Sequence, residues 1–246
     1  MKVKELYLAW QDPIDRWWIP VGRLSFDSEK CIFRFVYTKG AEISPNFQAF
    51  GPMKDLHVAY ESEELFPLFK NRLLEKSRPE YKRHLEWLNM PVDEIEPFMM
   101  LATTGGIRET DTLEVFACPE RNGNGKYETH FPSHGLRHLD KHSIKRVDGL
   151  CIGERLFIMP DSQNPYDPSA LALRTTDPMV LVGYCPRYLT HDFGEVLEKC
   201  GPDAIHVTVE RVNDDAPLHL RLLCKLVSPW PEGFEPCSDE TYQPLA

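Results

Sequence analysis

Seven residues between positions 137 and 187 have side chains suited to holding a nucleic acid. They combine planar, cationic and short polar groups, and they are Arg137, His138, Asn164, Tyr166, Asp167, Tyr184 and Arg187. A groove for a single strand offers aromatic faces for stacking, guanidinium groups for phosphates, and short polar side chains for base or sugar edges. We expect all seven residues on loops or strand ends, where they could line such a groove.

The same stretch also fits ordinary packing. In Asn164-Pro-Tyr166-Asp167-Pro, the Asn and Asp side chains can bond their own backbone, and proline fixes φ, as in a common turn. Tyr184 on a strand likewise fits half-buried packing. The residue pattern alone therefore leaves a turn and a binding groove open.

The net charge of -10 excludes a general binder of polyanions, because non-specific DNA affinity comes mainly from neutralised phosphates. Any nucleic-acid contact must be local, and cations do gather in one stretch: Arg137, Lys141, Lys145, Arg146 and Arg155. No apolar run reaches the roughly 20 residues of a membrane span, and the first residues lack the apolar block of a signal peptide. We expect a cytoplasmic protein without membrane contact.

A metal site is not expected. Four histidines recur every four residues, a spacing that stacks ligands on a helix, at His130, His134, His138 and His142. Pro132 and Gly135 argue against a helix there, and imidazoles without cysteine or carboxylate partners make a poor zinc set. The seven cysteines are scattered without a C-x-x-C pair and are expected to be reduced thiols. We expect neither metal nor cofactor.

Catalytic signatures are also missing from the sequence. It contains no Gly-x-Ser-x-Gly elbow, no glycine-rich phosphate loop before a helix, and no kinase-type catalytic pair. Thr103-Thr-Gly-Gly106 superficially matches a phosphate loop. We expect it to be a helix C-terminus with a glycine cap, because anion sites form at helix N-termini. The sequence predicts a protein that is not an enzyme.

Residues 1–119 are predicted to form an α+β domain. Aromatic and β-branched runs predict an antiparallel meander over residues 6–10, 17–26 and 31–37, with a final strand over 113–118. Apolar residues at helical spacing predict three helices, over residues 63–76, 77–88 and 93–105. Ser62 is the expected N-cap of the first, and Asp93-x-x-Glu96 is the capping box of the third.

Residues 120–126 have linker composition, with two glycines and two asparagines. Residues 127–230 are predicted to form a small antiparallel β-barrel with one helix, and residues 231–246 a loosely ordered, proline-containing tail. The expected strands lie near Leu136 and over residues 156–159, 170–174, 179–184, 205–212 and 218–226. The helix is expected over residues 188–199, and Asn213-Asp-Asp-Ala-Pro217 should form a hairpin turn.

Four pieces in fixed order resemble a HIRAN domain: His134-Gly-Leu-Arg137-His138, Gly153-Glu154, Asp161-Ser-Gln-Asn164-Pro-Tyr166-Asp167-Pro-Ser-Ala170-Leu171, and Val182-Gly183-Tyr184. The resemblance covers about residues 131–227. It implies an OB-like barrel that grips single-stranded DNA ends. On the matching positions, it implies DNA contacts by Arg137, His138, Asn164, Tyr166, Asp167 and Tyr184, with Asp167 helping to hold a terminal 3′-hydroxyl.

This chain departs from the family's pattern at three places. In the best-known DNA-binding member the position of His138 is tyrosine, and that of Tyr184 is histidine. The aromatic residue expected between the last two strands has no counterpart, since Asp214-Asp215 stand there and would repel phosphate. These differences bear on specificity for a DNA end.

Residues 6–118 resemble, more loosely, the N-terminal subdomain of HipA-type toxin kinases, through Gly22-Arg-Leu, Leu65–Leu74 and Phe98–Gly106. The resemblance implies that this part attaches the chain to a protein partner. One function that follows is a non-catalytic factor that binds single-stranded DNA or its 3′ end. The alternative is an antitoxin-like or scaffolding interaction module that partners a separately encoded HipA-type kinase and uses the barrel only as structure. A DNA-processing accessory recruited to a helicase or nuclease differs from the first only in its partner.

Overall fold

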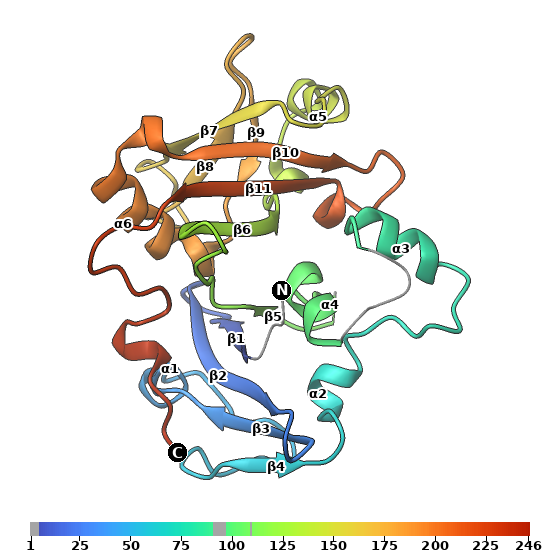
Figure 1. The fold of residues 1–246 in the computed structure, drawn as a ribbon, viewed down its shortest axis with the longest axis vertical. Coiled ribbons are helices and arrows are strands. Elements are labelled where there is room, and N and C mark those ends of the chain that lie inside the picture. Colours follow the sequence, from blue (N-terminus) through green and yellow to red (C-terminus); the bar gives the residue numbers. More distant parts are fainter. Residues whose placement is uncertain (1–4, 91–96, 109) are drawn as a thin grey trace. The chain divides into compact units, whose positions relative to one another are not determined.

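Apolar and aromatic side chains along residues 5–37 build the first sheet of the computed structural model, which describes residues 5–90, 97–108 and 110–246. The sheet contains β1 (Glu5–Gln11), β2 (Trp18–Asp27), β3 (Ile32–Tyr37), β4 (Tyr60–Ser62) and β5 (Leu113–Phe116). The strand order is β4-β3-β2-β1-β5, and neighbouring strands are antiparallel (Figure 1). The predicted meander is confirmed, with β4 as an added strand.

The described residues divide into two compact units. The first contains Met1–Tyr81, Asp93–Cys118 and Cys237–Ala246, and the second contains Lys82–Val92 and Pro119–Pro236. Each unit therefore combines segments that are far apart in the sequence. None of the helices in the described ranges is long and apolar enough to cross a membrane.

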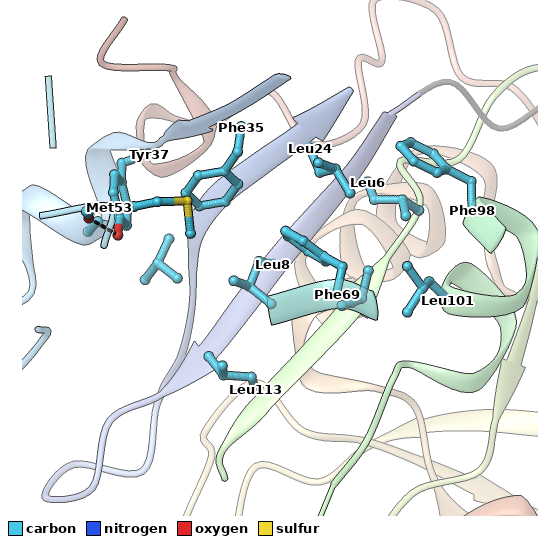
Figure 2. Packing of buried hydrophobic residues seen from close by; sticks show 13 residues of the cluster. Leu6, Leu8, Leu24, Phe35, Tyr37, Met53, Phe69, Phe98, Leu101 and Leu113 are labelled. Carbon is cyan, nitrogen blue, oxygen red and sulfur yellow. Dashed lines mark hydrogen bonds between the residues drawn. The ribbon is translucent and has the colours of Figure 1, made fainter. Parts of the chain in front are cut away.

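A hydrophobic core of aliphatic and aromatic side chains packs against the first sheet (Figure 2). Phe35 and Tyr37 of β3 are fully buried and pack against each other edge to face, with ring centroids 5.0 Å apart. The Tyr37 hydroxyl donates a 2.7 Å hydrogen bond to the Met53 carbonyl, so its polar end is satisfied inside the core. Short helices bring Phe69 and Leu101 into this core.

The helices expected over residues 63–76 and 77–88 are shorter in the structure, and a short helix at residues 39–43 was not expected. The helices of the first half are α1 (Lys39–Ile43), α2 (Pro67–Lys70), α3 (Tyr81–Trp87) and α4 (Pro97–Thr104). The predicted helix over 63–76 is wrong in extent, because the Arg72 guanidinium is tied to Asp111 and to the Gly106 carbonyl instead of lying on a helix surface. Ser62 caps a turn, accepting from the Glu64 amide. Asp93 and Glu96, the expected capping box, lie outside the described residues.

The end of α4 matches its prediction. The helix stops at Thr104, and Gly105 and Gly106 follow with φ of 69° and 55°. The Gly106 amide donates to the Thr104 hydroxyl oxygen at 3.0 Å. Thr103-Thr-Gly-Gly106 is therefore a glycine-capped helix C-terminus.

Residues 237–246 differ from the loosely ordered tail expected from the prolines. Tyr242 is buried and packs edge to face on Tyr7 of β1, with ring centroids 4.9 Å apart. The Leu245 amide donates to the Tyr37 carbonyl at 2.9 Å, and Lys39 pairs with Glu240. An aromatic contact and backbone hydrogen bonds hold this segment on the first unit, which composition does not reveal.

The second unit is a curled antiparallel half-barrel of six strands. They are β6 (Lys126–Pro132), β7 (Arg155–Pro160), β8 (Leu171–Arg174), β9 (Leu181–Tyr184), β10 (His206–Val212) and β11 (Leu222–Pro229). The order is β6-β11-β10-β7-β8-β9, and the bridge between His134 and Tyr184 links the chain after β6 to β9. Helix α6 (Thr190–Cys200) packs Phe193 against Phe131 at 5.4 Å between ring centroids. The α+β class and the barrel-like second part are confirmed.

Three local expectations in this unit are wrong. Residues 136–138 form a 3₁₀ helix instead of a strand, because Gly135 takes a left-handed φ of 76° and turns the chain. Strand β6, at the end of the expected linker, was not among the predicted strands. Helix α5 (Lys141–Asp148), capped by the Asp140 carboxylate on the Ser143 amide, has no counterpart in the predictions, because its sequence is polar on most positions.

Helix α3 belongs to the second unit from Lys82 onward and covers the β10–β11 turn. Leu88 packs with Ala216 and Leu220 in a small apolar cluster. The Asn213 side chain donates to the carbonyls of Trp87 and Leu220, at 2.9 and 2.8 Å. The half-barrel is thus completed by a segment that precedes it in the chain by about thirty residues.

Candidate functional site

The site is built around a close backbone contact between His134 and Tyr184. The amides and carbonyls of His134 and Tyr184 exchange two hydrogen bonds, of 2.9 and 3.0 Å. A Cβ on Gly135 would lie 2.9 Å from Cδ2 of the Tyr184 ring, so the ring covers this glycine. A Cβ on Gly183 would lie 1.8 Å from the Ser133 hydroxyl oxygen. Both positions require glycine, and together they bring Tyr184 beside the 3₁₀ helix that carries Arg137 and His138.

Asp161 connects two of the predicted site residues. Its Oδ2 accepts from the Tyr184 hydroxyl at 3.0 Å and from Nδ2 of Asn164 at 3.2 Å. Burial and the Asp161 carboxylate raise the pKa of Tyr184, so this hydroxyl keeps its proton and stays a donor. The sequence analysis quoted Asp161 as part of a motif but did not propose it as a site residue. Its signal was its place as the first residue of the loop after β7.

The turn interpretation is confirmed for Asn164 and Asp167. The Oδ1 of Asn164 accepts from the Tyr166 amide at 3.0 Å, and the Oδ1 of Asp167 accepts from the Ser169 amide at 2.9 Å. The second Asp167 oxygen lies 3.5 Å from Nε of Arg187. These polar side chains shape the loop between β7 and β8 and tie it to the segment after β9.

Three of the seven predicted residues present their side chains to solvent. Tyr166, at the tip of the loop, is 68% exposed, a high value for a tyrosine. Arg137 and His138 are exposed on the 3₁₀ helix, where Nε of Arg137 donates to Nε2 of His138 at 2.9 Å. The seven residues therefore divide into an exposed set (Arg137, His138 and Tyr166) and a framework set (Asn164, Asp167, Tyr184 and Arg187).

His134, whose backbone pairs with that of Tyr184, carries no charge at neutral pH. Its Nε2 is inaccessible to solvent, and its ring lies 6.2 Å from that of Tyr188. Burial is the largest of the effects that lower the pKa of His134 to about 4, and the charges of His219 and Arg187 act in the same direction. The imidazole behaves as a neutral packing group above that pH.

The four regularly spaced histidines do not share one element. His130 lies on β6, His134 in the bridge to β9, His138 in the 3₁₀ helix and His142 on α5. Across the residues that the structure describes, no three side chains of His, Cys, Asp or Glu are placed to hold a metal ion.

Local charge around the site is mixed. Lys141 and Lys145 are exposed on α5, whereas Arg146 pairs with Glu154. Asp215, one of two acids expected to repel phosphate, lies 2.5 Å from Nη2 of Arg83 and accepts from Nε1 of Trp87 at 3.1 Å. Helix α3 therefore neutralises part of the negative charge on the β10–β11 turn, an effect that the turn's own sequence could not predict.

One family model matches a segment of the second unit. Residues 126–231 match the family model of the HIRAN domain. The solved structures similar to this chain include a protein from Lactobacillus plantarum, 17% identical, with a TM-score of 0.33, over 42% of this chain and 97% of that one. Another is the HIRAN domain of human HLTF, 16% identical, with a TM-score of 0.31, over 42% of this chain and 74% of that one. No curated protein matches the chain. The resemblance of residues 6–118 to HipA-type kinases stays a prediction.

Proposed function

We propose that this chain binds single-stranded or end-exposed DNA and does so as a non-catalytic accessory factor, since residues 126–231 match the family model of the HIRAN domain. The main observation for this proposal is that the exposed set, Tyr166, Arg137 and His138, faces solvent, while hydrogen bonds hold the loop between β7 and β8 in place. Exposed planar and cationic groups on a rigid support are what a stacking site for nucleic acid needs.

Each exposed side chain has a distinct task in this proposal. Tyr166 stacks on a base near the strand end, Arg137 binds the adjoining phosphate, and His138 offers a second planar surface. Asp167 keeps acceptor capacity after bonding the Ser169 amide, since each carboxylate oxygen has two lone pairs. It can therefore accept a hydrogen bond from a terminal 3′-hydroxyl, in agreement with the family resemblance.

Fluorescence anisotropy with labelled single-stranded DNA tests the proposal. Tyr166→Ala should weaken binding by about tenfold, since base stacking on an aromatic side chain contributes about 1–3 kcal/mol. Tyr166→Phe should bind like the unmodified protein, because it keeps the ring. Arg137→Ala should weaken binding, whereas Arg34→Ala, an exposed arginine of the first unit with the same charge change, should not. Unchanged affinity for both Tyr166→Ala and Arg137→Ala would refute the site.

The choice of DNA end is tested separately. A strand whose 3′-hydroxyl is blocked by phosphate should bind less tightly than a free strand, and Asp167→Asn should reduce that difference. Equal affinity for free and blocked strands would limit the proposal to single-strand binding without recognition of the end.

A protein-interaction module is the second candidate, and the turn between β1 and β2 favours it. Ile14 and Trp17 are 71% and 62% exposed there. The turn is rigid, because Oδ1 of Asp12 accepts from the Ile14 and Asp15 amides. A partner such as a HipA-type kinase should then co-purify after nuclease treatment and be lost in Trp17→Ala. Purification of the chain alone would count against this candidate.

A further inference from the structure

A basic and aromatic strip lies on the face of β7 and β8. Arg155, Phe157 and Met159 alternate along β7, so they share one face, and Arg174 of β8 stands opposite Phe157. The guanidinium carbons of Arg155 and Arg174 lie 4.9 and 5.2 Å from the centroid of the Phe157 ring. We call Arg155, Phe157, Met159 and Arg174 the β7–β8 strip.

The two guanidinium groups keep most of their donors for a ligand. Arg155 donates one hydrogen bond to the Ile205 carbonyl at 3.4 Å, and Arg174 donates one to the Thr175 carbonyl at 3.2 Å. Over residues 5–90, 97–108 and 110–246, these hydrogen bonds and the Phe157 ring are the contacts of the two groups, and neither forms an ion pair with a carboxylate. Since each guanidinium has five N–H donors, the strip presents two positive charges and several donors from a chain whose net charge is -10.

The strip is continuous with the site at the end of β7. Met159 pairs with Ala172, and Ala172 pairs with Tyr184, so Tyr184 lies on the same face of the sheet as the strip. Strand β7 then leads into the loop that carries Asp161 and Tyr166. At about 3.3 Å per residue, Phe157 lies roughly 13 Å along the chain from Asp161. A strand held at Tyr166 could therefore reach both arginines within a few nucleotides.

We propose that the β7–β8 strip binds the sugar–phosphate backbone of the same single strand whose end is held at Tyr166. This inference rests on the proposed function. Guanidinium groups bind phosphates by paired N–H donors, and the shared Phe157 ring holds both groups in place while they do so. The ring itself is covered by the two cations, so the strip reads phosphates and not bases. It therefore extends the site in length without adding sequence preference.

Strand length provides the test. The full chain is titrated with labelled oligothymidylates of about 2 nucleotides, too short to extend beyond Tyr166 to the strip, and of about 12 nucleotides, a size within the range that single binding folds cover. The double variant Arg155→Gln with Arg174→Gln should bind the longer strand at least tenfold more weakly. For this variant, the slope of log affinity against log salt concentration should be smaller in magnitude by about 1.4, because each lost phosphate contact removes about 0.7 from the slope. Its affinity for the shorter strand should be unchanged.

Control variants separate charge from folding. Arg155→Lys with Arg174→Lys should keep much of the affinity for the longer strand, and Arg34→Gln should keep all of it. Equal affinity of the double Gln variant for the longer strand, with Tyr166→Ala still impaired, would overturn the strip and leave the proposed function intact. No binding of either strand by the unmodified protein would overturn both. Equal competition by an acidic peptide, polyglutamate of similar length, would assign the strip to a protein ligand and overturn its role in DNA binding.

Discussion

Aromatic side chains near the candidate site have different surroundings from those in the core of the first unit. In the first unit, Phe35 and Tyr37 are fully buried, and the Tyr37 hydroxyl is satisfied inside the core by the Met53 carbonyl and the Phe50 amide. In the second unit, Tyr166 is exposed, and Phe157 lies on the sheet surface under two guanidinium groups. The hydroxyl of Tyr184 donates to a loop carboxylate instead of a core carbonyl.

The difference shows that residue type alone does not identify a binding aromatic. Both units contain tyrosine and phenylalanine on strands or next to them, but Phe35 and Tyr37 of the first are buried, whereas Tyr166 of the second is exposed on a braced loop. What separates a stacking surface from a core ring is where the polar end of the side chain finds its partner, and whether the ring face stays open. The following changes break or sharpen this contrast, ordered from the largest expected effect on stability to the smallest.

Phe35→Ala should destabilise the first unit by about 3–5 kcal/mol, the usual cost of removing a fully buried phenylalanine. Hydrogen–deuterium exchange should speed up in β1, β2 and β3. Affinity for single-stranded DNA should change little, since the ring is far in sequence from the candidate site. Arg34→Ala, on the same strand but exposed, is the matched control. Equally fast exchange in β7–β10 would show that the two cores are not independent.

Acidification should selectively weaken the second unit through His134. Its pKa is about 4 when folded and about 6.5 when unfolded, so the unfolded chain takes up a proton first as the pH falls. The contribution of His134 to stability is complete above pH ~6.5, declines between pH ~6.5 and ~4, and amounts to up to about 3 kcal/mol. Urea denaturation of His134→Leu should show a shallower pH dependence. Parallel curves for variant and parent would contradict the burial argument.

Leu88→Ala should destabilise the second unit by about 2 kcal/mol, because Leu88 is buried against Ala216 and Leu220 in a small cluster that can partly collapse. Exchange should rise first in the β10–β11 turn. Lys82→Ala, exposed on the same helix, serves as the control. If only residues 81–90 exchanged faster, the helix would be an appendage and not a part of this unit.

The bond between Tyr184 and Asp161 should contribute about 1 kcal/mol, the usual net value of an intramolecular hydrogen bond. Tyr184→Phe removes only the hydroxyl and keeps the ring over Gly135. A double-mutant cycle with Asp161→Ala isolates the pair, measured by denaturation in urea. A coupling energy near zero would mean that packing and not this bond fixes the loop.

Tyr166→Ala should change stability by less than about 0.5 kcal/mol, because most of its ring already contacts water. Its effect should instead appear in DNA affinity, as proposed above. A loss of stability comparable with that of Phe35→Ala would place Tyr166 among the packing aromatics and remove the contrast between the units.

Strand patterns and helix ends were readable from the sequence where local chemistry decides them. Runs of aromatic and β-branched residues predict β1, β2 and β3, and paired glycines predict the end of α4 at Thr104. The turn bonds of Asn164 and Asp167 also follow from their residue types. Such features depend on neighbours a few residues away.

Features that depend on residues far away in the chain could not be predicted from the sequence. The 3₁₀ helix at Leu136 depends on Gly135, whose conformation is matched to the ring of Tyr184. Asp161 acquires its role only when β9 brings that hydroxyl to it, and the charge of Asp215 is offset by Arg83, more than a hundred positions earlier. Exposure, which separates Tyr166 from Asn164 within one loop, cannot be read from residue type either.

The interleaving of the two units has a consequence for how the protein is made. Strands β1–β5 are synthesised before the half-barrel, but the ring of Tyr242, which covers Tyr7 and Phe116, is added only after the half-barrel is complete. Domains generally fold as units during synthesis, in the order in which they emerge. Here the first unit must wait, with an apolar face in contact with solvent or chaperones, until the second has emerged. Segment 237–246 covers this apolar face. A nascent chain whose synthesis stops before residue 237 would leave the face exposed.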